Sequence, residues 1–170
     1  YNNLKIFLVD FNHQLCRSYV YLKNIYPKSR HILPKEFSLL KDYKEIENNS
    51  IIYVKVGDYY KLNNIKADLI TNFFSFGEMQ RGTFNKYFNS EIINNCSYLY
   101  LINRFVSSPF FEPTFESNLN IFDYLKNNFS KVYFDIFPMH HYYKYPRKVF
   151  NRLSSRPISS PLFEMILKKN

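Results

Sequence analysis

Short apolar segments recur along the chain, and polar residues follow each of them. They are Leu4–Asp10, Ile51–Val56, Ala67–Phe73, Ser97–Asn103, Lys131–Phe137 and Phe163–Lys168. Runs of this length that are rich in branched and aromatic residues are typical of buried parallel strands. A further short strand is expected at His31–Leu33.

Between these segments the apolar residues return at helical spacing. Leu15, Tyr19 and Leu22 would share one helix face, and Pro27 marks the end of that helix. Further helices are expected over 37–46, 80–95 and 118–129. Strands that alternate with helices predict an α/β fold, with a mostly parallel sheet covered by helices on both faces. A length of 170 residues suits a single domain over residues 1–170.

The segment from Pro138 to Pro161 has neither the apolar runs of a strand nor the spacing of a helix, and it holds four of the eight prolines. An irregular segment of this length inside a domain is usually functional or else disordered. If it is functional, its place after a strand makes it a candidate loop for selecting a substrate.

Charge, apolar run length and cysteine content limit which binding partners and which cellular compartment are expected. The net charge is +9, but the basic residues are scattered, so no specific nucleic-acid partner is expected. No apolar run reaches the roughly 18 residues of a membrane helix, so no membrane span is expected either. Cys16 and Cys96 are expected to be buried free thiols, and no metal-binding spacing is present. These features favour a cytoplasmic protein.

Ligands of open parallel sheets bind at the carboxyl ends of the strands, where two acids stand out. Asp10 is a candidate for binding both hydroxyls of a ribose; the alternative is a solvated acid or a helix cap. Asp58 is a candidate acceptor for an adenine amino group; the alternative is ordinary Gly-Asp turn chemistry.

Later strand ends carry candidates for proton transfer and substrate binding. His140 or His141 is the candidate general base, against the alternative of a surface loop. Glu78 is a second candidate base, or a residue that orients the histidine. Arg104 is a candidate for holding a substrate oxygen, or else a surface salt-bridge partner.

The segment Asp68–Met79 carries the most specific pattern in the chain. Its Ser75-Phe76-Gly77-Glu78-Met79 resembles the Ser-Phe-x-Glu-Met signature that follows the fourth strand in a family of sugar O-methyltransferases. Three other segments resemble that family in the same order: Ile6–Asp10, Tyr98–Arg104 and Pro161–Met165. The family belongs to the class I S-adenosylmethionine-dependent methyltransferases.

The resemblance implies a Rossmann-like sheet with an antiparallel last strand and S-adenosylmethionine as cofactor. The substrate would be a hydroxyl of a sugar or glycan precursor. The implied cofactor-binding residues are Asp10, Asp58, Asn72 and Ser75. The implied substrate-binding residues are Asn103 and Arg104.

The chain departs from the family at its start. The first strand and its glycine-rich loop should precede Asp10 by about 20 residues, and they are expected upstream of Tyr1. Two other functions stay open: a non-catalytic methyltransferase-like binding or scaffold domain, motivated by the missing loop, and an RNA-directed methyltransferase, motivated by the charge.

Overall fold

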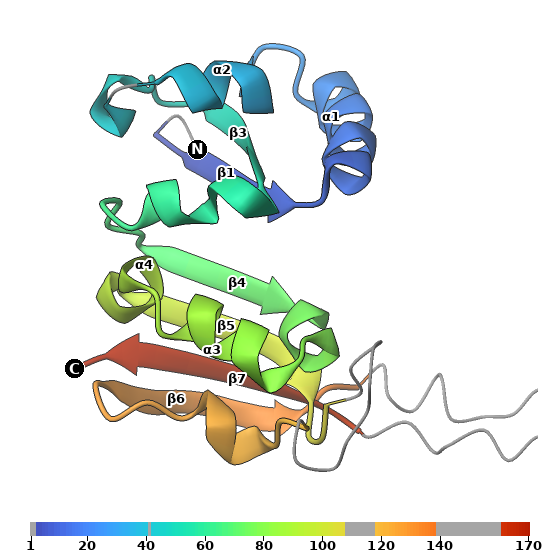
Figure 1. The fold of residues 1–170 in the computed structure, drawn as a ribbon, viewed down its shortest axis with the longest axis vertical. Coiled ribbons are helices and arrows are strands. Elements are labelled where there is room, and N and C mark those ends of the chain that lie inside the picture. The colour runs from blue at the N-terminus through green and yellow to red at the C-terminus, as the bar shows by residue number, and fades with distance from the viewer. Residues whose placement is uncertain (1–2, 41, 108–117, 139–160) are drawn as a thin grey trace, which may run out of the picture. The chain divides into compact units, whose positions relative to one another are not determined.

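The fold is given by a computed structural model that describes residues 3–40, 42–107, 118–138 and 161–170. The chain divides into two compact units, unit 1 (Tyr1–Ile65) and unit 2 (Lys66–Asn170). Each unit has its own sheet (Figure 1). The prediction of a single domain over residues 1–170 stays a prediction.

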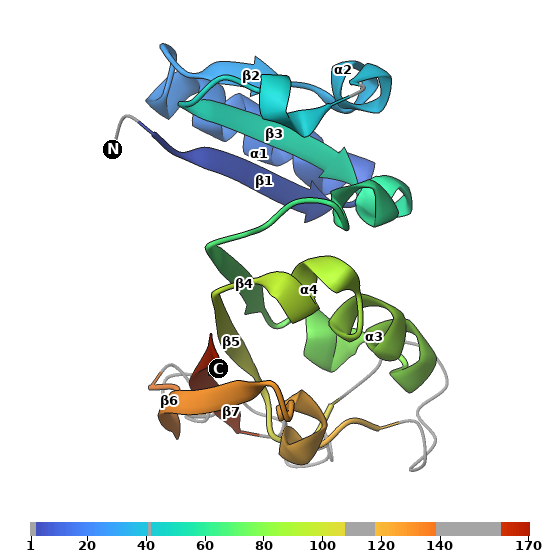
Figure 2. The same cartoon turned by 90° about the vertical axis from the view of Figure 1, so that its left-hand side faces the viewer.

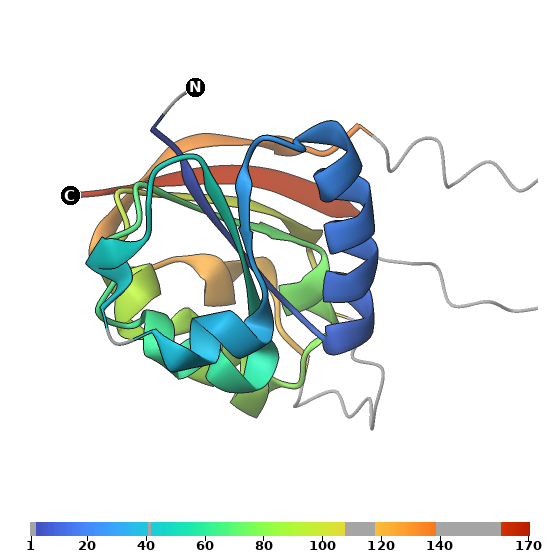
Figure 3. The same ribbon diagram turned by 90° about the horizontal axis from the view of Figure 1, so that it is seen from above.

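Unit 1 is built around three parallel strands in the order β1-β3-β2. Its elements are β1 (Lys5–Asp10), α1 (Asn12–Ile25), β2 (Arg30–Ile32), α2 (Pro34–Leu39), η1 (Tyr43–Glu45), β3 (Ser50–Lys55) and η2 (Val56–Leu62). Helix α1 lies behind the strands in Figure 2. It begins at the carboxyl end of β1 and runs back along the sheet (Figure 3).

The central strand β3 is buried on both faces. On one face Ile51 and Tyr53 pack against Leu15 of α1. On the other, Ile52 and Val54 are fully buried, and both α2 and η2 contact this strand. Such two-sided burial explains why the strand is an unbroken apolar run in the sequence.

The side chain of His31, in β2, connects two elements of unit 1. Its Nε2 lies 3.1 Å from the carbonyl oxygen of Tyr26, and its Nδ1 lies 3.0 Å from the hydroxyl of the buried Tyr53. A carbonyl can only accept, so Nε2 carries the hydrogen in this arrangement. The side chain therefore ties β2 to the end of α1.

Unit 2 contains a four-stranded sheet in the order β4-β5-β7-β6. Its elements are β4 (Leu69–Phe73), η3 (Ser75–Glu78), α3 (Arg81–Phe88), α4 (Glu91–Asn95), β5 (Tyr98–Arg104), η5 (Ile121–Tyr124), β6 (Phe129–Ile136) and β7 (Leu162–Lys169). Strand β7 is antiparallel to both β5 and β6, whereas β4 and β5 are parallel. It follows that β4, β5 and β6 all run in the same direction.

One face of this sheet carries the core of unit 2. Along β5, Leu99 and Leu101 are fully buried, whereas Tyr98 on the opposite face is 40% exposed. The buried face meets a cluster of aromatic rings whose members contact one another in a chain. They are Phe76, Phe84, Phe88, Tyr124 and Phe163.

Helix lengths differ from the sequence-based expectations. The helix expected over 80–95 is two helices, because Asn89 ends α3 and Ser90 starts α4 after a break. The helix expected over 118–129 is the single turn η5, which Asn120 and Asp123 close as a reciprocal cap. Short polar residues that bond to nearby backbone favour such ends over helix continuation.

The two cysteines differ in burial. Cys96 is buried as expected, and burial raises the pKa of its thiol to about 11. The prediction for Cys16 was wrong, because this residue lies on an exposed part of α1.

The α/β class with mostly parallel strands is confirmed, and the last strand is antiparallel as the resemblance implies.

Candidate functional site

The carboxyl edge of the unit 1 sheet carries Asp10. The parallel register pairs Asp10 with Lys55, so the ends of β1 and β3 lie at one edge, and Asp58 follows in η2. The Asp10 side chain is exposed, and its Oδ1 accepts the backbone N–H of Phe11 at 2.8 Å. Its Oδ2 makes no hydrogen bond to a described residue, which leaves an acceptor free for a ligand hydroxyl.

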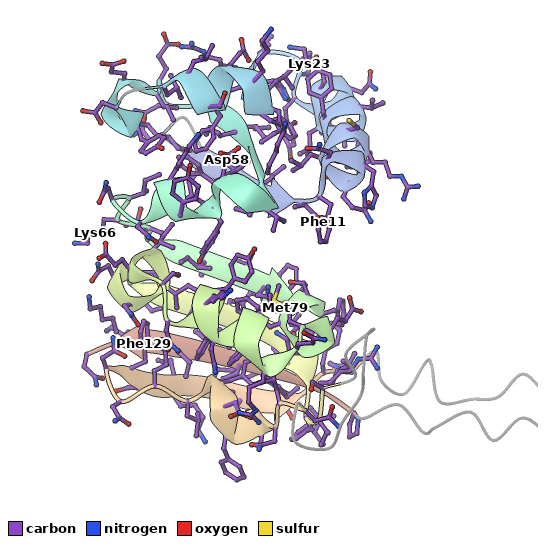
Figure 4. All side chains as sticks on the ribbon, viewed as in Figure 1. Phe11, Lys23, Asp58, Lys66, Met79 and Phe129 are labelled. Carbon is purple, nitrogen blue, oxygen red and sulfur yellow. The ribbon has the colours of Figure 1, made fainter. Side chains whose placement is uncertain are left out.

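An exposed aromatic ring stands next to Asp10. Phe11 is 63% exposed, and it stacks on His13 with the ring centroids 6.1 Å apart. Figure 4 shows its side chain projecting from the end of β1. Sequence reasoning missed Phe11, although an apolar residue between a strand-end acid and a helix was a usable signal.

Asp58 is partly engaged by its own element. Its Oδ1 lies 3.0 Å from the Nζ of Lys61, three residues further along η2. The hydrogen bond to Asp58 raises the pKa of Lys61, against an opposing effect of burial. One carboxylate oxygen of Asp58 is therefore occupied, and the other makes no hydrogen bond to a described residue.

A groove of about 570 Å³ in unit 1 does not belong to this site. Its lining includes Leu4, Ile6 and Asn49. These residues lie at the amino ends of β1 and β3, and neither Asp10 nor Asp58 contributes to the lining.

The carboxyl edge of unit 2 begins with a strained turn after β4. Phe74 has a φ of 68°, a left-handed conformation that is uncommon for a residue with a side chain. Its backbone N–H donates to the carbonyl oxygen of Ile102 at 2.8 Å, so the strand pairing continues one residue past β4. The chain then turns sharply into η3.

Two asparagine side chains hold this turn in place. Asn103, at the end of β5, is fully buried, and its Oδ1 accepts the N–H of Gly77 at 3.0 Å. Its Nδ2 donates to the Oδ1 of Asn72 at 3.1 Å. Asn72 in turn accepts the N–H of Phe76 at 3.1 Å and donates to the Oγ of Ser75 at 2.6 Å.

Apolar packing against α3 and close packing against β5 also hold this turn. The ring of Phe76 lies 5.5 Å from that of Phe84 and 5.9 Å from that of Phe88, centroid to centroid. At Gly77, an added Cβ would lie 3.5 Å from the backbone nitrogen of Arg104, so η3 packs closely on the end of β5. Polar and apolar contacts therefore both hold the turn in this conformation.

Two charged side chains at this edge are uncommitted. Glu78, the last residue of η3, makes no hydrogen bond or ion pair with a described residue. The guanidinium of Arg104, the last residue of β5, likewise has no carboxylate partner in the described part of the chain. Both remain available to a ligand.

The structure thus gathers the predicted residues into two groups. Unit 1 brings Asp10 and Asp58 to one edge of its sheet. Unit 2 brings together the others that it describes: Asn72, Ser75, Glu78, Asn103 and Arg104. Because β6 runs parallel to β4 and β5, it delivers Pro138 to that same edge. The candidate bases His140 and His141, and residues 139–160 of the predicted loop, lie outside the described residues.

Asn103 differs from the other members of the unit 2 group. Its two polar side-chain atoms are both used inside the protein, and the residue has no exposed surface. Direct substrate binding by this residue stays a prediction, and any influence on a ligand through the turn would pass by way of Asn72 and Ser75.

Among the described residues, no three His, Cys, Asp or Glu side chains gather closely enough to hold a metal ion. Within the same ranges, no helix has the length and apolar character needed to cross a membrane. Comparison of the chain with protein-family models finds no match. A comparison with curated proteins finds none either.

Proposed function

We propose that this chain is a Rossmann-like, S-adenosylmethionine-dependent methyltransferase that acts on a hydroxyl of a sugar or glycan precursor. The observation that carries the proposal is the segment Asp68–Met79. Its Ser75–Met79 resembles the sugar O-methyltransferase signature, and it forms a turn at the carboxyl edge of unit 2 that the side chains of Asn72 and Asn103 hydrogen-bond. The antiparallel last strand adds support.

The residues of unit 1 fit the adenosine part of the cofactor. The exposed Oδ2 of Asp10 is an acceptor for ribose hydroxyls, and Phe11 offers an exposed apolar ring beside it. The uncommitted oxygen of Asp58 is an acceptor for the adenine amino group. When bound, S-adenosylmethionine supplies a methyl group carried on a positively charged sulfur.

The residues of unit 2 fit the tasks of alignment and proton removal. A hydroxyl that takes up a methyl group must lose its proton, so a base must lie within hydrogen-bond reach. Glu78 has a carboxylate without a partner among the described residues, so it stays a candidate base, as do His140 and His141. The guanidinium of Arg104 is suited to hold an oxygen-bearing substrate in line.

The test is methyl transfer from labelled S-adenosylmethionine to a panel of nucleotide sugars and glycan precursors, with the full-length protein. Wild type should label at least one sugar, and Asp10→Ala should label much less. Asp68→Ala is the matched control, because Asp68 is an exposed acid directly before the amino end of β4 and should leave labelling unchanged.

Other results would favour the competing functions. Folded protein that binds no cofactor would favour a non-catalytic binding or scaffold domain. Labelling of RNA, with salt-resistant affinity for one sequence, would favour an RNA-directed enzyme, because binding by scattered basic residues alone weakens steeply with salt.

A further inference from the structure

We infer that Asn103 and Asn72 are positioning residues that fix the Ser75 hydroxyl as a hydrogen-bond donor to a ligand oxygen. This inference rests on the proposed function for the identity of the ligand. The direction of the hydroxyl itself follows from the hydrogen bonds of the turn alone.

Two backbone N–H groups of this turn can only donate. The backbone N–H of Gly77 points at one end of the Asn103 amide, so that end must be the oxygen. The backbone N–H of Phe76 points at one end of the Asn72 amide, which must also be the oxygen. The two main-chain N–H groups therefore determine which end of each side-chain amide is the oxygen.

These orientations leave the nitrogen of Asn72 facing Ser75. The Nδ2 of Asn72 lies 2.6 Å from the Oγ of Ser75. An amide nitrogen has no lone pair to offer, so the hydroxyl oxygen must accept, and its hydrogen must point elsewhere. Ser75 is exposed, and its hydroxyl makes no second hydrogen bond to a described residue.

The turn therefore presents a preset donor at the carboxyl edge of β4. Because Asn103 is fully buried and Phe76 is anchored among aromatic rings, little freedom is left to lose when a ligand binds. A donor in this position recognises an oxygen with a lone pair. Under the proposed function that oxygen is the carboxylate of the cofactor's methionyl part, or else the acceptor oxygen of the sugar.

One substitution reverses the donor without removing it. In Asn72→Asp, the carboxylate still accepts from the Phe76 N–H and from Asn103, so the turn keeps those bonds. It can no longer donate to Ser75, so Ser75 must donate inward instead. The hydroxyl stays in place, but its hydrogen is no longer available to a ligand.

Calorimetry with two probes tests the ligand. S-adenosylhomocysteine carries the carboxylate, whereas methylthioadenosine has the same adenosine and thioether without it. Ser75→Ala and Asn72→Asp should each weaken binding of S-adenosylhomocysteine about tenfold and leave methylthioadenosine unchanged. In a Ser75→Ala background, Asn72→Asp should add less than about twofold, which separates reversal of the donor from the added charge.

Other outcomes are equally decisive. Unchanged cofactor affinity with a raised KM for the sugar in both variants would identify the acceptor oxygen as the ligand. Losses that multiply in the double variant, or no loss in Ser75→Ala on either measure, would overturn the positioning role. Thermal unfolding should confirm that both single variants fold.

Neutron diffraction of the unliganded protein separates this inference from the proposed function. The deuteron of Ser75 should point away from Asn72 in wild type and toward residue 72 in Asn72→Asp. If it does, and wild type binds neither probe, the proposed function fails while the preset hydroxyl stands. A wild-type deuteron that points at Asn72 would overturn the inference even if the cofactor binds.

Discussion

The two carboxyl edges hold their candidate site residues in opposite ways. In unit 1, Asp10 is exposed, and its one hydrogen bond goes to the next residue in the chain. In unit 2, Asn103 has no exposed surface, and its hydrogen bonds reach residues 26 and 31 positions away. In unit 1, the charged side chain of Asp10 contributes little to the stability of the fold. In unit 2, the hydrogen bonds that set the geometry of the edge also stabilise the fold.

The difference has a physical cause in what each unit buries. The centre of unit 1 is a strand whose buried side chains are mostly apolar, so no side-chain amide is needed there. The turn after β4 instead buries Phe76 and Gly77, and the backbone N–H groups of both need partners. Asn72 and Asn103 supply those partners. Stability and site geometry are therefore coupled in unit 2 and separate in unit 1.

The largest expected effect comes from breaking the buried amide. Asn103→Leu keeps the approximate size but leaves the Gly77 N–H without its acceptor, and it removes one of the two hydrogen bonds that the Oδ1 of Asn72 accepts. It should lower the free energy of unfolding by about 3 kcal/mol, measured by urea unfolding followed by circular dichroism. Asn85→Leu, at an exposed position in α3, is the control and should change stability by less than about 0.5 kcal/mol. Equal effects of the two substitutions would show that the buried hydrogen bonds of Asn103 do not stabilise unit 2.

A second, smaller effect concerns the ion pair that ties the start of α3 to η5. Arg81 donates to both carboxylate oxygens of Asp123, at 2.6 and 3.1 Å. Burial raises the pKa of Asp123, but the hydrogen bonds from Arg81 and from the Asn120 N–H outweigh it, so the pKa is lowered overall. Asp123→Asn should cost about 1.5 kcal/mol near neutral pH, after allowance for partial exposure.

The sign of the pH dependence follows from that lowered pKa. The carboxylate stabilises the fold above the ordinary pKa of an aspartate, and this contribution is lost as the pH falls through the lowered value. The stability difference between wild type and Asp123→Asn should therefore shrink between about pH 6 and about pH 2. A difference that stays constant over this range would show that the charge of Asp123 contributes nothing.

The third effect sharpens the comparison at the level of the backbone. Phe74 holds a φ of 68°, which glycine adopts freely and alanine does not. Phe74→Gly should therefore be more stable than Phe74→Ala by about 1 kcal/mol, the reverse of the usual order of these residues in regular structure. Thermal unfolding of the two variants compares them directly, and a more stable alanine variant would mean that the turn carries no strain.

Local features of the fold could be predicted from the sequence, and contacts between distant residues could not. The strands followed from their apolar runs, and Asp10 is at the end of its strand as expected. The joint role of Asn72 and Asn103 depends on the register of β4 against β5, which pairs Asn72 with Leu101, and no local pattern encodes it. The left-handed Phe74 was equally hidden, because only a glycine would have signalled that conformation.

The break at Asn89 shows a further limit. Phe84, Phe88 and Ile92 share one helical face in the sequence, and all three are buried. The chain satisfies this pattern with two short helices, because Ser90 bonds back to the carbonyl oxygen of Tyr87 instead of extending α3. Apolar spacing predicted which residues lie in the core, but short polar residues decided where the helices end.

The most direct test of the account is calorimetric titration of the full-length protein with S-adenosylhomocysteine, in wild type and in Asp10→Ala. We expect saturable binding of one molecule by wild type. In Asp10→Ala the binding should be weaker by about 1–3 kcal/mol, while the free energy of unfolding changes by less than about 0.5 kcal/mol. Asp68→Ala should bind as wild type does. Absence of binding by wild type, or equal affinity of wild type and Asp10→Ala, would contradict the proposal that Asp10 of unit 1 binds the cofactor.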